Sequence, residues 1–376
     1  MQNRFGLLRV SLAVAVCAAV VAFVSAPAQA QAKKDKKEEP VRTQLDNGLK
    51  VIVIPTKRHS VVVTAMIYRI GTGDDMPGKA GLAHLISRVV PYAASQDYKE
   101  GTGLAALQKV GFQKNAEKDV GSRVFRDATC YYSILNSDKV ELALKIEAER
   151  VTGLMFAPEL VKREALKATE IVHAQMQEPE GAMLARVLGL VFTVHPYRFP
   201  VLGFERDITT IGVDQARAHY DTFYMSNSAT LVVIGKVDPE SVVGLVNKYY
   251  GSFPAGALVE TVRKEEPPQT GGRSTVLRFD VPAERIMLGY AGAALASKMQ
   301  AALLVVTDYL NDELKKRLVD GGKATEVSVS YDWLNTDPGP LVIKAVMPEG
   351  KEHVEALELI HATIGEIGDK GLDEKL

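Results

Sequence analysis

Two parts of this 376-residue chain show the same order of segments, in which β-rich runs lead into amphipathic helices. In the first part, Leu45–Ile54 contains two strand-like runs joined by Asn47-Gly48, a dipeptide typical of a two-residue hairpin turn. Ser60–Tyr68 is another β-rich run, and helical periodicity follows over 141–155 and 159–176. Because antiparallel strand signals alternate with helices, the sequence predicts an α+β fold, a two-layer sandwich of mainly antiparallel sheet and helices.

The second part follows a segment rich in proline and glycine, and it repeats the first part in outline. Its predicted elements are strands at Ser274–Phe279, Arg285–Tyr290 and Glu326–Tyr331 and a helix at Ser297–Leu318. We therefore predict an N-terminal domain at 41–255, a linker at 256–272 and a C-terminal domain at 273–376. Gly371–Leu376 resembles the start of another helix, so we expect the second domain to be an incomplete repeat.

The first forty residues differ in composition from the rest. Arg4 and Arg9 precede an apolar run that ends near Val24, and Ala28-Gln29-Ala30 offers the small-x-small pattern of a signal peptidase site. We predict a signal peptide at 1–30, cleaved near Ala30, a charged tether at 31–40, and a mature chain without a membrane span. The protein is then periplasmic or secreted, and Cys130 is the one cysteine that remains after cleavage.

The composition of the chain excludes several classes of protein. Hydrophobic residues make up 47% and charged residues 24%, as in ordinary globular domains and unlike disordered or collagen-like chains. Lys and Arg total 45 against 46 Asp and Glu, so the overall charge does not favour nucleic acid as a partner.

Several short segments resemble the pitrilysin/insulinase family of zinc metallopeptidases, which includes the subunits of mitochondrial processing peptidase. In chain order, they are Leu45-Asp-Asn-Gly-Leu-Lys-Val, Gly71-Thr-Gly, Gly81-Leu-Ala-His84, His195-Pro-Tyr-Arg-Phe-Pro-Val-Leu-Gly203, Phe223-Tyr-Met-Ser-Asn227, Val233-Ile-Gly-Lys-Val-Asp-Pro239 and Pro340-Leu-Val-Ile-Lys-Ala-Val. Their order and spacing identify the fold as metallopeptidase-like, with one full domain and a second, truncated repeat.

Active members of that family carry His-x-x-Glu-His on a helix directly after Gly-Leu-Ala. The two imidazoles bind zinc from one helix face, and the glutamate activates the metal-bound water. This chain has His84-Leu-Ile-Ser87-Arg88 instead. A guanidinium has no free lone pair and a serine is no general base, so His84, Ser87 and Arg88 form a degenerate motif. We expect no catalytic residues, no cofactor and no bound metal at this motif.

The resemblance implies a third zinc ligand, a glutamate on a later helix. Glu170 is the best match if one insertion or deletion is allowed, although a solvated helix residue is the alternative. His173, one helical turn later, is the residue with which a rearranged zinc site could be completed. If any zinc binds, we expect it at His84, Glu170 and His173.

The family also holds substrate with an arginine and a tyrosine seven residues apart in the second domain or in a partner subunit. Leu318 stands at the arginine position and Thr325 at the tyrosine position. Arg317 is one position away and Tyr331 belongs to the next strand, so the sequence predicts that this clamp is lost as well.

Three functions remain open. The first is a non-catalytic, exported subunit that pairs with a zinc-motif-bearing homologue in the degradation of peptides or unfolded proteins. The second is a binding or scaffold protein of the cell envelope without a protease partner, and the third is an active zinc metalloendopeptidase with a rearranged site. The intact scaffold combined with the altered motif favours the first function.

Overall fold

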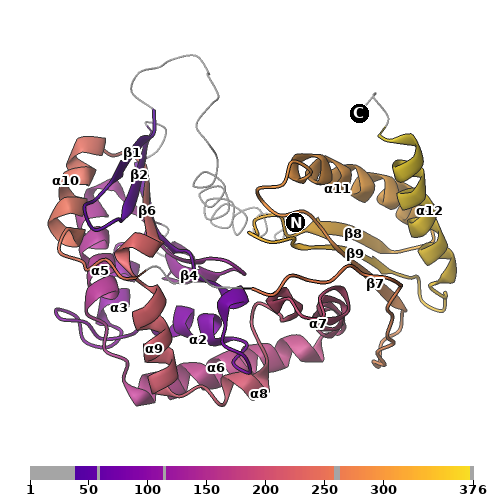
Figure 1. Ribbon diagram of the computed structural model, residues 1–376, viewed down its shortest axis with the longest axis horizontal. Helices are drawn as coiled ribbons and strands as arrows, with labels where there is room; N and C mark the ends of the chain where they lie inside the picture. Colours follow the sequence, from indigo (N-terminus) through magenta and orange to yellow (C-terminus); the bar gives the residue numbers. More distant parts are fainter. Residues whose placement is uncertain (1–38, 57–59, 113–115, 258–262, 373–376) are drawn as a thin grey trace. The chain divides into compact units, whose positions relative to one another are not determined.

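The computed structural model describes residues 39–56, 60–112, 116–257 and 263–372 (Figure 1). The predicted signal peptide and nearly all of the tether lie outside these residues. The chain divides into two compact units, of which the first contains the residues up to His173 together with Val201–Val262, and the second contains Ala174–Pro200 and Arg263–Leu376.

The first unit is built on a six-stranded sheet in the order β1-β2-β6-β3-β5-β4. The strands are β1 (Val41–Gln44), β2 (Lys50–Pro55), β3 (Val61–Tyr68), β4 (Val120–Val124), β5 (Thr129–Asn136) and β6 (Ala229–Gly235). Only the pair β2 and β6 is parallel, and the other neighbours are antiparallel. The predicted mainly antiparallel sheet is therefore confirmed, with β4 at one edge.

The hairpin at the start of the fold forms where its turn residues predict it. The amide of Leu45 donates to the carbonyl of Leu49 at 3.0 Å, and Gly48 adopts a φ of 86°, which glycine tolerates best. The Asn47 side-chain amide also donates to the carbonyl of Tyr250 at 2.8 Å. The turn thus starts the sheet and also holds the end of a distant helix.

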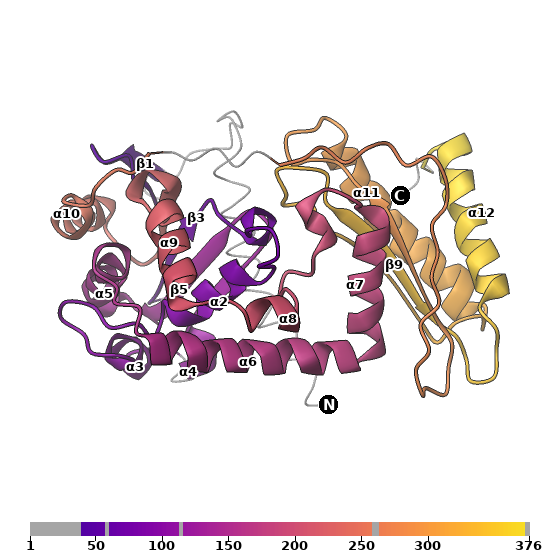
Figure 2. The same cartoon turned by 60° about the horizontal axis from the view of Figure 1, so that its bottom comes forward.

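Helices cover one face of this sheet (Figure 2). They are α2 (Leu82–Val89), α3 (Thr102–Lys109), α5 (Val140–Thr152), α6 (Pro158–Gln177), α9 (Val213–Phe223) and α10 (Pro239–Tyr250), and the unit also contains the short helices α4 (Ala116–Asp119) and α8 (Glu205–Ile208). Alternate strand residues such as Val53 and Met66 pack against helix residues such as Leu85 and Val246 in one buried core. The first unit is therefore a two-layer sandwich, as predicted.

The second unit has a three-stranded antiparallel sheet in the order β7-β9-β8. Its elements are α7 (Pro179–Val191), β7 (Arg285–Ala291), α11 (Gln300–Leu314), a π-helix η5 (Lys315–Asp320), β8 (Glu326–Tyr331), β9 (Pro340–Val346) and α12 (Val354–Lys370). Helix α7 packs on β7 so closely that a Cβ on Gly289 would lie 2.4 Å from Val187 Cγ1. This contact groups residues 174–200 with the second unit, whereas the sequence-based limits 41–255 include them in the first domain.

One local prediction for the second unit is wrong. Ser274–Phe279 forms no strand, because the sheet contains no partner for it, and Val276 is 86% exposed. Gly371 and Leu372 follow the end of α12, and the rest of the helix start predicted at Gly371–Leu376 lies outside the described residues, so it stays a prediction. A strand-like composition predicts a strand only where a neighbouring strand supplies hydrogen bonds.

A carboxylate within the predicted linker, that of Glu266, is hydrogen-bonded to residues 193–195 of the second unit. Glu266 accepts hydrogen bonds from the backbone amides of Thr193, Val194 and His195 at 2.7–3.0 Å. Desolvation of the carboxylate raises the pKa of Glu266, but these hydrogen bonds lower it by more, to about 2. His195 Nδ1 accepts from the Tyr197 amide at 3.2 Å, so its Nε2 is the atom that donates to Asp337 at 3.2 Å. His195 is thus a structural histidine.

Among the described helices, none combines the length and the apolar character needed to cross a bilayer.

Candidate functional site: a degenerate metallopeptidase motif

Helix α2, which carries His84, Ser87 and Arg88, starts at a fixed point. Asp75 accepts hydrogen bonds from the backbone amides of Gly81 at 2.7 Å and Ala83 at 2.8 Å, and so satisfies amides that the first helical turn leaves unpaired. Gly81 has a φ of 103°, which explains the glycine before Leu82-Ala83.

A second segment closes over the start of α2. A Cβ on Gly203 would lie 2.3 Å from the carbonyl oxygen of Ala80, and Gly203 has a φ of 80°, so only glycine fits there. The Phe204 amide donates to the Ala80 carbonyl at 3.2 Å, and the Ala80 amide donates to Asp207 at 3.2 Å. Residues 203–207, at the end of the segment that begins at His195, therefore hold the start of α2 in place.

His84 is buried and neutral. Burial of the side chain lowers its pKa to about 4. The positive charge of Arg88 lowers the pKa as well, whereas the hydrogen bond to the Leu202 carbonyl raises it. Nδ1 lies 3.1 Å from the carbonyl oxygen of Leu202, so this nitrogen carries the proton and donates it. The lone pair of the imidazole is consequently on Nε2. A backbone carbonyl that orients an imidazole in this way is the usual support of a metal-binding histidine.

Ser87 has a structural role. Its hydroxyl donates to the His84 carbonyl at 2.7 Å, and its own carbonyl accepts from the Ser122 hydroxyl on β4 at 2.7 Å. The side chain is 3% exposed. Ser87 therefore links α2 to the sheet edge, and its hydroxyl hydrogen is already used within the helix.

Arg88 is held by a buried carboxylate from α6. Its Nη2 lies 3.0 Å from Oε2 of Glu164, whose side chain has no exposed surface. The other oxygen of Glu164 accepts from Lys167 Nζ at 2.9 Å and lies 3.6 Å from Arg163 Nε. A guanidinium offers no lone pair and repels a dication, so the residues present at this position do not fit zinc.

Glu164 is the site residue that the sequence analysis missed. The apolar periodicity at 159–176 comes from Leu160, Val161, Leu166 and Ile171. Leu160 and Val161 are buried, but Leu166 and Ile171 are 56% and 40% exposed. The buried positions of α6 are Leu160, Val161, Glu164, Ala168 and Val172. Glu164 follows Leu160 by four residues and precedes Ala168 by four. This spacing is the signal that could have placed it on the face toward α2.

Glu170 and His173 do not join His84. Both lie on exposed positions of α6, and His173 Nδ1 is 3.3 Å from an exposed oxygen of Glu205. Within the described ranges, no three side chains of His, Cys, Asp or Glu are grouped closely enough to bind a metal ion. The expectation that no metal binds stays a prediction, and the rearranged set of His84, Glu170 and His173 gains no support from the geometry.

Residues at and near the positions of the substrate clamp are buried or hydrogen-bonded within the second unit. Leu318 is fully buried, and the Thr325 hydroxyl donates to the Val346 carbonyl at 3.2 Å. Tyr331 is 8% exposed, and its hydroxyl accepts from the Ala293 amide at 3.0 Å.

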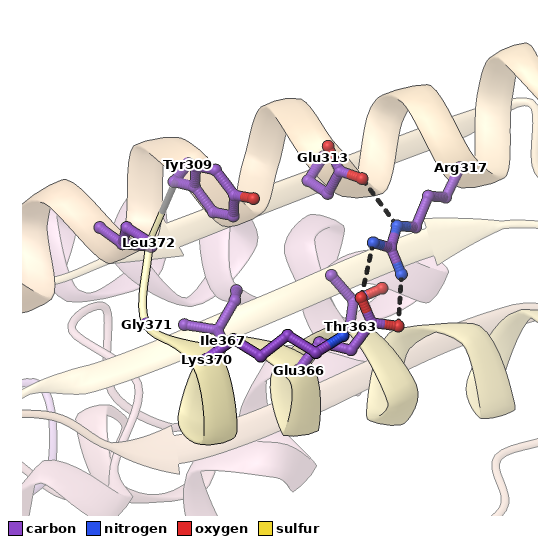
Figure 3. Close-up of a pocket in the computed structure, with 9 residues that line it drawn as sticks. All are labelled: Tyr309, Glu313, Arg317, Thr363, Glu366, Ile367, Lys370, Gly371 and Leu372. Carbon is purple, nitrogen blue, oxygen red and sulfur yellow. Dashed lines mark hydrogen bonds and ion pairs between the residues drawn. The ribbon is translucent and has the colours of Figure 1, made fainter. Parts of the chain in front are cut away.

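Arg317 lines a pocket of about 180 Å³ between α11 and α12 (Figure 3). Its Nε donates to Glu313 at 2.8 Å, and its two Nη atoms donate to Glu366 at 3.1 and 3.0 Å. These carboxylates raise the pKa of Arg317 further. Because two carboxylates engage the guanidinium, Arg317 joins α11 to α12.

The two buried neutral histidines predict a loss of stability in acid. Burial lowers the pKa of His219, like that of His84, from 6.5 to about 4. Between pH 6.5 and 4 the unfolded chain binds more protons, so the stabilisation is complete above pH 6.5 and falls as the pH decreases through this window. At pH 5 we expect each histidine to cost about 2 kcal/mol of unfolding free energy.

Urea unfolding at pH 7.5 and pH 5.0 tests this expectation. The Nε2 atom of His219 is buried without a hydrogen-bond partner, so His219→Leu should leave the fold intact. The variant should lose about 2 kcal/mol less than the unmodified protein between the two pH values. Equal losses in both proteins would contradict the assignment of a neutral, buried His219.

Comparison with known proteins connects this geometry to one family. The family model of insulinase (Peptidase family M16) matches residues 50–203, and that of the Peptidase M16 inactive domain matches residues 210–376. The zinc protease PqqE of Helicobacter pylori is 24% identical over 297 residues, which cover 77% of this chain and 65% of the relative. The chain thus spans less than two thirds of that relative's length.

Solved structures agree on the fold. A protease from Helicobacter pylori superposes with a TM-score of 0.83 and 21% identity, covering 90% of this chain and 82% of the other. The first half of the periplasmic protease PqqL from Escherichia coli gives a TM-score of 0.70 and 17% identity, covering 92% of this chain and 75% of the other. Together with the two family models, these likenesses show that the chain belongs to the M16 family of insulinase- and pitrilysin-like peptidases.

Proposed function

We propose that this chain is a non-catalytic, exported member of its family that assembles with a homologue carrying an intact His-x-x-Glu-His motif. In this complex it takes part in the degradation of peptides or unfolded proteins. The observation that carries the proposal is the contact between Arg88 and the buried Glu164, because a guanidinium stands where the second zinc-binding imidazole is required. The chain itself holds no zinc in this proposal.

The scaffold around the altered motif supports a retained role in an assembly. Helix α2 keeps the Asp75 cap and the close approach of Gly203 to Ala80, and His84 keeps its orienting carbonyl. These contacts fix the helix to the sheet whether or not it performs chemistry. A fold whose catalytic residues are replaced while its framework persists can keep a binding function.

The proposed location is the periplasm or the extracellular space, without a membrane span in the mature chain. Residues 1–30 have the charged start, apolar run and small-residue cleavage pattern of a signal peptide. The Escherichia coli neighbour PqqL is described as periplasmic, which is consistent with export of this chain.

Co-purification with a homologue that carries the intact motif and comes from the same organism tests the partner role. We expect an equimolar complex in size-exclusion chromatography with light scattering, and peptide hydrolysis at least about tenfold faster than by the homologue alone. Replacing the motif glutamate of the homologue by glutamine should abolish this activity, whereas Ser87→Ala in this chain should leave it unchanged. Two separate monomers with no gain in hydrolysis would overturn the proposal and leave a binding protein without a protease partner.

A further inference from the structure

The altered motif has gained positive charge. Three cations, Arg88, Arg163 and Lys167, lie within 3.6 Å of the single carboxylate of Glu164. Arg163 also pairs with Glu100 at 2.9 Å, which is the second carboxylate of this group. The cluster therefore keeps one cation more than its own carboxylates neutralise. In a partly buried setting, such an excess attracts a further anion more strongly than it would in bulk water.

Arg88 is the cation with unused donors. Its Nη2 donates to Glu164, while its Nε and Nη1 make no hydrogen bond to any part of the chain that the structure describes, and Nε is buried. Its side chain is 24% exposed, so part of it is in contact with solvent. An arginine with unused donors is suited to a carboxylate, with which it forms short, charge-assisted hydrogen bonds.

The surroundings of Arg88 favour an anion over other ligands. Lys167 and Arg163 have side chains that are 45% and 44% exposed, so the rim of the site is also positive.

We propose that Arg88, with Lys167 and Arg163 around it, is an anchor for the carboxylate of a bound peptide, in the place where catalytic relatives hold their metal. The carboxylate comes from the C-terminus of the peptide or from an acidic side chain. This inference rests on the proposed function, which supplies the class of ligand. The intact motif of catalytic relatives binds a cation, whereas the altered motif would bind an anion.

Fluorescence anisotropy with three labelled versions of one unstructured peptide distinguishes the two sources. The first version has a free C-terminal carboxylate, the second is amidated, and the third is amidated and carries one internal glutamate. If the C-terminus is the ligand, we expect the free-carboxylate peptide to bind the unmodified protein about tenfold more tightly than the amidated peptide without glutamate. If an acidic side chain is the ligand, the glutamate-containing peptide should show this gain instead. Equal affinity for all three versions would overturn the anchor.

Variants of the two central residues give effects of opposite sign. Arg88→Gln should abolish the preference for the carboxylate, and Arg88→Lys should keep part of it. Glu164→Gln removes the competing carboxylate and should strengthen binding several-fold. Arg206→Gln is the matched control, because Arg206 has a side chain 84% exposed on another helix and should leave affinity unchanged.

The result also separates this inference from the proposed function. Each variant is compared with the unmodified protein by circular dichroism and thermal melting, and Arg88→Lys preserves the charge if Arg88→Gln unfolds. If Arg88→Gln leaves the carboxylate preference unchanged, the anchor is wrong, even where the complex with the zinc-motif homologue still forms. If the complex fails to form while the preference depends on Arg88, the anchor stands and the partner role is wrong.

Discussion

The double variant Ser87→Glu, Arg88→His is expected to bind zinc at about one ion per chain, whereas the unmodified protein should contain far less. His84 is already oriented, because its Nδ1–H is directed at the Leu202 carbonyl and its lone pair is on Nε2. A histidine at position 88 follows His84 by four residues and therefore lies on the same helix face.

Glu164 completes this expected site. In the unmodified protein, its Oε2 lies 3.0 Å from Nη2 of Arg88. A histidine side chain is about 2 Å shorter than an arginine side chain, and this difference is close to the length of one zinc–ligand bond. The exchange should therefore open room for an ion between His84, the new histidine and Glu164. Lys167 can remain on the other carboxylate oxygen, where it lies at 2.9 Å.

Elemental mass spectrometry after dialysis without chelator measures the zinc content. The triple variant that adds Glu164→Gln should lose the metal, while a triple variant that adds Glu170→Gln should retain it. A zinc-induced rise in melting temperature gives a second readout. If the Glu170 variant loses zinc and the Glu164 variant keeps it, the assignment of Glu164 as the facing carboxylate is wrong.

Arg150→Met is expected to lower the unfolding free energy by about 3–5 kcal/mol. Arg150 and Glu147 form a buried ion pair within α5, in which Glu147 is 3% and Arg150 6% exposed. Arg150 Nη2 also lies 3.4 Å from the Pro91 carbonyl, and its backbone carbonyl accepts the Tyr220 hydroxyl hydrogen. Without the guanidinium, a buried carboxylate would be left without its counter-ion.

The pH dependence identifies the cause of this loss. Burial raises the pKa of Glu147 even with Arg150 beside it, and removing Arg150 should raise it further. The cost of the substitution should therefore be largest at neutral and higher pH and should shrink as the pH falls through the pKa of Glu147 in the folded protein.

Chemical denaturation of three variants checks the argument. Glu147→Gln combined with Arg150→Met should recover most of the lost stability, because no buried charge remains. Lys248→Met removes an exposed pair, in which Lys248 and Glu141 are 61% and 53% exposed, and should cost far less than Arg150→Met. Equal losses for Arg150→Met and Lys248→Met would show that burial does not set the cost.

Local signals in the sequence predicted much of the first unit. Asn47-Gly48 fixes the turn of the β1–β2 hairpin, and the alternating run at Ser60–Tyr68 becomes β3, a central strand. The helices at 141–155 and 159–176 form as α5 and α6. These predictions succeed because a turn dipeptide and a repeating apolar pattern act over only a few residues.

Predictions that needed distant contacts were less complete. The strand-like Ser274–Phe279 has no neighbour in the three-stranded sheet, and α7 packs on β7 although about a hundred residues separate them in the chain. Of the apolar residues that marked α6 as a helix, Leu160 and Val161 are buried, but Leu166 and Ile171 are exposed and the charged Glu164 lies on the buried face. Composition alone does not reveal which face a helix buries, because the surface that covers it comes from elsewhere in the chain.

The altered motif His84-Leu-Ile-Ser87-Arg88 is evident from the residues alone, since the chemistry of a guanidinium and a hydroxyl does not depend on the fold. The order and spacing of short segments likewise indicated the family. Which carboxylate faces Arg88 became known only from the packing of α2 on α6, because the two residues are 76 positions apart in the chain. The tertiary structure also showed that Arg317 and Tyr331, the arginine and tyrosine nearest to the clamp positions, already have hydrogen-bond partners inside their own unit.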